Sequence, residues 1–73
     1  MNIADMTIHI HQDLLPVHRE RLEKEIRVFD GVTLARFSRS IKHGLFVIYD
    51  SESISSNKIL RRVRQWDKSA VIF

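Results

Sequence analysis

The spacing of the apolar residues alternates between two periods along this chain, and the order of those periods constrains its fold more than any other feature. Residues 6–11 alternate apolar and polar side chains, a pattern that predicts a strand with Ile8 and Ile10 buried. From Pro16, which suits the first turn of a helix, apolar residues follow at helical spacing until Gly31 ends the pattern. The first half of the chain is therefore predicted to be a strand followed by an amphipathic helix.

The second half of the chain predicts a hairpin, a second helix and a final strand. Residues 32–40 and 45–49 form the two strands of the hairpin, joined by a polar turn. Either Ser55 or Ser56 caps the second helix, and the apolar residues 70–73 close the chain as a last strand. The predicted order of elements is βαββαβ.

This order predicts a ferredoxin-like plait, a fold of the α+β class. It is a four-stranded antiparallel sheet with both helices on one face, here as a single domain over residues 1–73. The chain contains no cysteine, which excludes disulfides, a thiolate zinc site and a thiol nucleophile. It shows no targeting segment and no apolar run of the roughly 18 residues that a membrane helix needs. We therefore expect a cytoplasmic domain with no membrane partner.

The helices of such a plait cover one face of the sheet and leave the other open. Pleating sends Leu34, Phe46 and Ile48 to the open face, where they lie on adjacent strands and form one apolar patch. His9 of the first strand shares this face. Isolated apolar residues are normal on a protein surface, which is the alternative interpretation. A continuous patch instead predicts an interface with a protein partner or with a second copy of the chain.

Basic residues gather in the predicted second helix with almost no acid among them. In the first helix the charges alternate in sign, which is typical of a solvated face. Lys58, Arg61 and Arg62 are either solvated in the same way or form an electrostatic footprint that orients an acidic partner.

Several short segments from Leu22 onward carry a resemblance to a known family. They are Leu22-Glu23-Lys24-Glu25-Ile26, Gly31-Val32, Phe46-Val47-Ile48-Tyr49-Asp50, Ile54-Ser55 and Ile59-Leu60. A helix ending at Gly-Val, a strand ending in Tyr-Asp and a helix opening at Ser recur at these separations in the heavy-metal-associated family, which the chain resembles. The resemblance implies the ferredoxin-like fold and a link to metal homeostasis.

The family also has a metal-binding segment, and this chain departs from it. The family binds metal through Met-x-Cys-x-x-Cys at the end of the first strand, and counting back from Leu22 places the two cysteines on Leu15 and His18. Copper(I) is a soft ion that depends on thiolate donors. The chain therefore resembles the cysteine-free branch of the family, whose members accompany metal-pumping P-type ATPases or stand alone, and copper(I) is not expected as its ligand.

Histidine and aspartate side chains near the same loop suggest a different metal chemistry. His11, Asp13 and His18 offer nitrogen and oxygen ligands for a divalent zinc, iron or nickel ion. His18 would lie in the first turn of the helix, where the macrodipole favours neutral imidazole. In the alternative interpretation His18 packs on the end of the core and Asp13 only caps the helix. His9 and His11 together could instead chelate a metal between two associated subunits.

RNA-recognition domains share the βαββαβ order and bind bases on the same open face of the sheet. Residues 42–49 match the basic first residue and the last four positions of their third-strand pattern, with Phe46 exposed and His9 on a neighbouring strand. Gly44 stands where the pattern requires a second ring. Single-stranded nucleic acid is thus the alternative partner, although a net charge of +3 is modest for that function.

Enzymatic activity is not expected from this sequence. The chain has no nucleophile with an adjacent base and no glycine-rich phosphate loop. It predicts a small binding or adaptor module that acts through protein contacts or self-association on its open sheet face.

Overall fold

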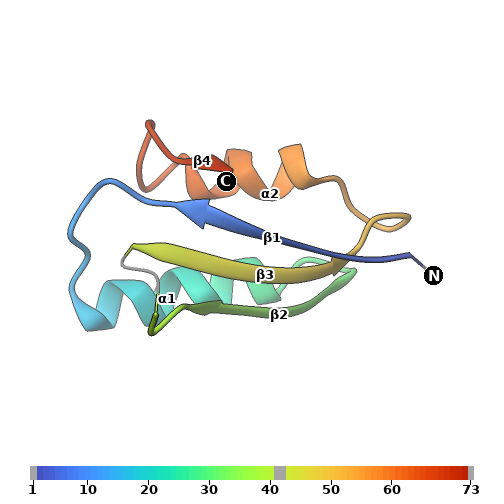
Figure 1. The fold of residues 1–73 in the computed structure, drawn as a ribbon, viewed down its shortest axis with the longest axis horizontal. Helices are drawn as coiled ribbons and strands as arrows, with labels where there is room; N and C mark the ends of the chain where they lie inside the picture. The colour runs from blue at the N-terminus through green and yellow to red at the C-terminus, as the bar shows by residue number, and fades with distance from the viewer. Residues whose placement is uncertain (1, 41–42, 73) are drawn as a thin grey trace.

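The chain forms the six elements that its apolar spacing predicts, in the predicted order. The structure is a computed structural model that describes residues 2–40 and 43–72. The elements are β1 (Ile3–His9), α1 (Pro16–Arg27), β2 (Val32–Phe37), β3 (Gly44–Asp50), α2 (Ser56–Val63) and β4 (Val71–Ile72) (Figure 1). The βαββαβ prediction is therefore confirmed.

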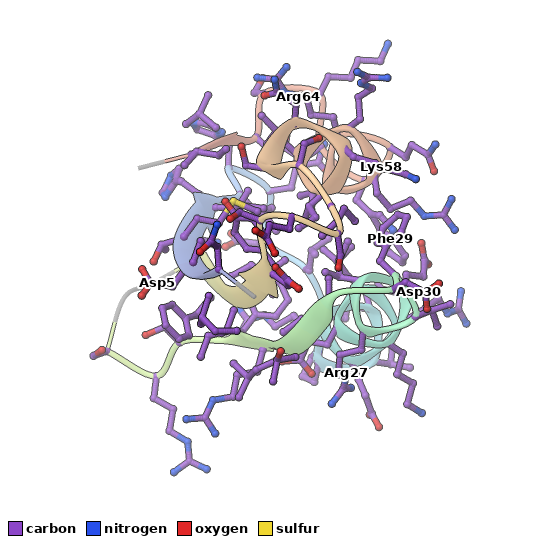
Figure 2. All side chains as sticks on the ribbon, turned by 90° about the vertical axis from the view of Figure 1, so that its right-hand side faces the viewer. Asp5, Arg27, Phe29, Asp30, Lys58 and Arg64 are labelled. Carbon is purple, nitrogen blue, oxygen red and sulfur yellow. The ribbon has the colours of Figure 1, made fainter. Side chains whose placement is uncertain are left out.

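The four strands form one antiparallel sheet in the order β2-β3-β1-β4. β1 and β3 lie in its centre, while β2 and the short β4 form the edges. Both helices lie on the same side of this sheet (Figure 2). The arrangement is a ferredoxin-like plait, so the predicted fold class is confirmed. Within the described residues, neither helix has the length and apolar composition of a membrane span.

The core lies between the helices and the covered face of the sheet. Ile8 of β1 and Val47 of β3 are fully buried there, as alternation predicts for one face of each strand. Residues at helical spacing meet them from the other side. The fully buried helix residues are Leu22 and Ile26 of α1 and Ile59 and Val63 of α2. The rings of Phe29, Phe37 and Trp66 pack against the margin of this core and are only partly buried.

Several strand boundaries differ from the predicted ones. β1 ends at His9 and not at residue 11, β3 is one residue longer at each end, and β4 begins at Val71 and not at residue 70. β1 begins at Ile3 and not at residue 6, because its pairing with β3 continues beyond the alternating pattern. β2 ends at Phe37 and not at residue 40. At Phe37 the backbone N–H donates a hydrogen bond of 2.7 Å to the carboxylate of Glu23 in α1. This contact blocks part of an otherwise unpaired strand edge. Ile41 and Lys42 of the predicted turn lie outside the described residues.

The two helices begin in different ways. α2 follows Ser55, whose hydroxyl accepts a hydrogen bond of 3.2 Å from the N–H of Lys58, so the cap is Ser55 and not Ser56. α1 follows Leu15 without a side-chain cap and starts at Pro16, which needs no N–H partner. The start of α1 is therefore set by Pro16 and by the loop that precedes it.

Candidate functional site

The open-face cluster comprises Leu34 of β2 and Phe46 and Ile48 of β3. Leu34 pairs with Ile48, which pairs on its other side with Asp5 of β1. In the next row, Arg36 of β2 pairs with Phe46. Because paired residues point to the same face, the cluster occupies two adjacent rows, with Asp5 and Arg36 at opposite corners.

The helices leave this cluster uncovered. Figure 2 shows Asp5 on the side of the sheet away from Phe29, which lies with the helices. Phe46 and Ile48 are partly exposed, whereas Val47 between them points to the opposite face and is fully buried. The side chains predicted to lie on the open face therefore do so, and the surface they form is accessible in the single chain.

A β-bulge in β2 brings Leu34 into the cluster. The register shifts between Val32, which pairs with Tyr49, and Leu34, which pairs with Ile48. Val32 packs against the core. In a regular strand Leu34, two residues later, would face the core as well. The bulge turns Leu34 to the open face instead, and apolar alternation alone does not reveal such an irregularity.

His9 lies on the open face one row beyond Phe46. It pairs with Gly44 on one side and with Val71 on the other. Its ring centroid lies 4.6 Å from that of His11 and 6.3 Å from that of His43, both in edge-to-face orientations. His9 therefore joins the open face to the loops at one end of the sheet.

The structure gives the three predicted metal ligands three different environments. His11 lies beside Asp67, with 3.6 Å between its Nδ1 and the carboxylate Oδ2. Asp13 is 3.1 Å from Nε2 of His43. Because α1 begins without a side-chain cap, the alternative interpretation of Asp13 as a helix cap is wrong. His18 extends from α1 toward an aromatic ring. Among the described residues, no three His, Asp or Glu side chains are arranged to hold a metal ion, so the structure does not bring this set together.

His18 packs on the end of the core, as its alternative interpretation holds. Its ring centroid lies 6.0 Å from that of Trp66. The indole Nε1 of Trp66 donates to Glu25 Oε1 at 3.3 Å, and Nε of Arg62 donates to the same oxygen at 3.2 Å. Glu25 thereby links α1 to α2 through Arg62 and to the turn after α2 through Trp66.

The basic group of α2 is only partly available to a partner. Arg62 is held by Glu25, and the Lys58 ammonium lies 5.8 Å from the centroid of the Phe29 ring. Arg61 is exposed and takes part in no ion pair found within the described ranges. The electrostatic role of Lys58, Arg61 and Arg62 stays a prediction.

Asp67 fixes the loop that follows β1, a role that sequence reasoning missed. Its side chain is only 4% exposed. The carboxylate accepts hydrogen bonds from the N–H of His11 at 2.6 Å and from the N–H of Ser69 at 3.0 Å. Burial alone would raise the pKa of Asp67, but these donors and the nearby His11 ring favour the charged form, and the pKa lies below its usual 3.8. The one sequence signal was a single acid among the basic residues after α2.

We expect Asp67→Asn to lower the free energy of unfolding by about 1–2 kcal/mol at pH 7, because charge-assisted hydrogen bonds to two backbone donors become neutral ones. The pKa is lower in the folded state, so the ionised carboxylate stabilises the fold above its unfolded value of 3.8. This contribution is lost as the pH falls below about 4. Urea unfolding of both proteins at pH 7 and pH 3 measures the difference, which should shrink at pH 3. Equal differences at both pH values would contradict the role assigned to the charge.

Comparison with solved structures identifies the fold. A copper-binding domain from HMA7, a P-type ATPase, superposes with a TM-score of 0.81 at 13% identity, covering 94% of this chain and 92% of that domain. Oxidized MerP from Ralstonia metallidurans CH34 gives 0.80 at 13% identity, covering 96% of both chains. A protein from Bacillus anthracis str. Ames gives 0.76 at 13% identity, covering 97% of this chain and 96% of that one. This chain has the heavy-metal-associated fold. No family model matches the sequence, and no curated protein matches it either.

The heavy-metal-associated fold is present here without its thiolate ligands. Leu15, one of the two positions that the family resemblance assigns to cysteine, is 60% exposed and offers no donor atom. His18, the other position, supplies one imidazole beside Trp66. These residues do not fit copper(I), which requires soft sulfur donors. The chain, with no cysteine, accordingly represents a cysteine-free version of this fold.

Proposed function

We propose that this chain is a non-enzymatic binding module that self-associates through its open sheet face. The observation that carries the proposal is the open-face cluster, in which Leu34, Phe46 and Ile48 occupy adjacent register rows with no helix above them. Exposed Ile3 and Val71, 59% and 42% accessible, extend the same face along β1 and β4. Burial of the open-face cluster favours association because it removes apolar area from water.

The charges at the corners of the cluster favour a second copy as the partner. Asp5 and Arg36 are exposed at diagonally opposite corners, and neither takes part in an ion pair found among the described residues. A two-fold axis parallel to the sheet and perpendicular to the line joining the two corners would place Arg36 of each copy over Asp5 of the other. Phe46 and Ile48 would then interdigitate near the axis, with the strands of the two sheets crossed.

The solved neighbours raise the question of metal. One of them is a copper-binding domain. This chain lacks the thiolates that copper(I) needs, so we propose that the fold serves macromolecular contacts here and not copper(I) capture. A role within metal homeostasis would then be that of a partner-binding domain and not of a carrier.

Phe46→Asp tests the self-association surface. We expect the variant to stay folded and to move from dimer to monomer in sedimentation velocity, since two carboxylates would be buried near the two-fold axis. Val28→Asp is the matched control, because it changes the net charge equally at an 81% exposed site at the end of α1. Loss of the dimer in both variants, or in neither, would contradict the open-face interface.

A charge exchange tests the proposed orientation. Arg36→Asp alone should weaken the dimer by placing two acids together, and adding Asp5→Arg in the same chain should restore it. If the double variant is as weak as Arg36→Asp alone, the two residues do not face each other across a two-fold axis.

A further inference from the structure

An open groove runs round the end of the edge strand β2, from α1 to the open sheet face. Its main hollow has a volume of about 810 Å3, and a second hollow of about 430 Å3 continues from it toward Arg19 and His43. The residues common to both hollows are Phe37, Ser38, Arg39 and Ser40. Since β2 is an edge strand with β3 on one side only, the groove along it has an open outer side that can admit an extended chain.

The excess positive charge of the chain is concentrated in this groove. Its charged lining residues are Arg19, Arg27, Arg36, Arg39 and Glu23. Their formal charge of +3 equals that of the entire chain, so the remainder of the chain is formally neutral. The one carboxylate, that of Glu23, is engaged with the N–H of Phe37 at 2.7 Å.

The guanidinium groups of the groove are available to an anion. Arg27, Arg36 and Arg39 are exposed, and none of them takes part in an ion pair found in residues 2–40 and 43–72. Arg19 lies over the ring of Phe37, with 5.6 Å between its Cζ and the ring centroid. Planar guanidinium groups bind phosphate oxygens in a forked geometry. The groove is thus suited to several anionic groups spaced along one ligand.

Aromatic rings beside these charges narrow the class of ligand. Phe46 of the open-face cluster lines the main hollow, and Phe37 lines both hollows. A basic groove with rings on which bases stack is the arrangement by which proteins bind single strands without strict sequence preference. An acidic peptide would satisfy the guanidinium groups but would supply no planar group for Phe46.

We propose that this groove binds single-stranded nucleic acid, with phosphates on Arg27, Arg36 and Arg39 and a base against Phe46. The nucleic-acid strand would run from α1, round the edge of β2, to the open face of the sheet. This path differs from the flat platform of RNA-recognition domains, because most of its phosphate contacts come from the edge strand and α1.

Fluorescence anisotropy of a labelled eight-nucleotide poly-dT tests the proposal. With three phosphate contacts, we expect affinity to fall by about twentyfold between 50 and 200 mM salt. Arg27→Ala combined with Arg39→Ala should weaken binding about tenfold at 50 mM salt and lower the log–log salt slope by roughly 1.4. The proposed dimer would cover Arg36 and Phe46, so the titration uses a chain concentration at which sedimentation velocity shows only monomer, and its failure is then separate from a failure of self-association.

Three comparisons complete the test. The control variant Lys58→Ala with Arg61→Ala removes the same charge from α2, and an equal loss of affinity there would overturn the groove assignment. An abasic oligonucleotide of the same length that binds as tightly as poly-dT would overturn the contact between a base and Phe46. Competition by a hexaglutamate peptide as effective as that by unlabelled poly-dT would identify an acidic peptide as the ligand instead. Absence of salt-dependent binding to the wild-type protein would overturn the proposal outright.

Discussion

Val47→Asp is expected to leave this domain unfolded at 25 °C. Val47 is fully buried on the helix side of β3, paired with Met6 of β1 and Ala35 of β2. The substitution removes about 1.5–3 kcal/mol of apolar burial, and a carboxylate at this position costs several kcal/mol more because no donor replaces its water. A chain of this length has about 4–11 kcal/mol of stability, so the loss is of the same size as the total. Far-UV circular dichroism and urea titration measure the outcome.

Phe46→Asp is the matched control for this prediction, since the same charge enters the neighbouring residue of the same strand. Phe46 is partly exposed on the open face, so its variant should keep the folded spectrum and most of its unfolding free energy. Opposite outcomes at adjacent positions would establish which face of β3 is covered. A folded Val47→Asp protein within about 1 kcal/mol of wild type would contradict the placement of the core.

The fold was predictable because its signals are local. Alternation around Ile8 and helical spacing around Leu22 identify elements from a few residues each, and both side chains are fully buried as expected. The position of Phe46 on the open face followed from pleating alone. The bulge in β2 and the strand boundaries needed tertiary information. At the end of β2, for example, the N–H of Phe37 donates a hydrogen bond to Glu23 of α1.

The contacts around the candidate sites were not predictable in the same way, because they join residues far apart in the chain. Asp67 is 56 positions from His11, and Glu25 is 37 positions from Arg62. The proposed metal ligands were grouped because His11 and Asp13 are close in sequence. In the fold His11 turns to Asp67, while Asp13 turns to the hairpin, so nearness along a loop did not produce a common site.

The basic groove escaped sequence analysis for a related reason. In α1, Arg19 and Arg27 are interleaved with acids, which is typical of a solvated helix face. The fold places that helix beside β2, which adds Arg36 and Arg39 to the same surface. The acids interleaved with Arg19 and Arg27 do not neutralise this surface, because they point elsewhere or, like Glu23, already accept a hydrogen bond. A chain with a modest total charge therefore has one strongly basic region.

Glycine is required at position 31 for two reasons, its backbone conformation and a close contact with another turn. Gly31 follows α1 and has φ of +95°, a conformation that L side chains rarely adopt. Its carbonyl accepts a hydrogen bond of 2.7 Å from the N–H of Asp50, at the end of β3. A Cβ at this position would lie 2.7 Å from Cβ of Ser53 and 3.3 Å from Cγ2 of Ile54. The turn between α1 and β2 therefore packs directly against the turn that leads to α2.

Gly31→Ala is accordingly expected to destabilise the domain by about 3 kcal/mol. The positive φ alone costs roughly 1–2 kcal/mol for an L residue, and the clash with Ser53 adds a similar amount because a backbone-linked Cβ cannot move aside freely. Asp30→Ala, an exposed neighbour, is the control and should change the unfolding free energy by less than about 0.5 kcal/mol. Combining Gly31→Ala with Ser53→Gly should recover the steric part and leave the conformational part, which urea unfolding of the single and double variants separates. A double variant no more stable than Gly31→Ala would show that the contact with Ser53 contributes nothing to the requirement for glycine.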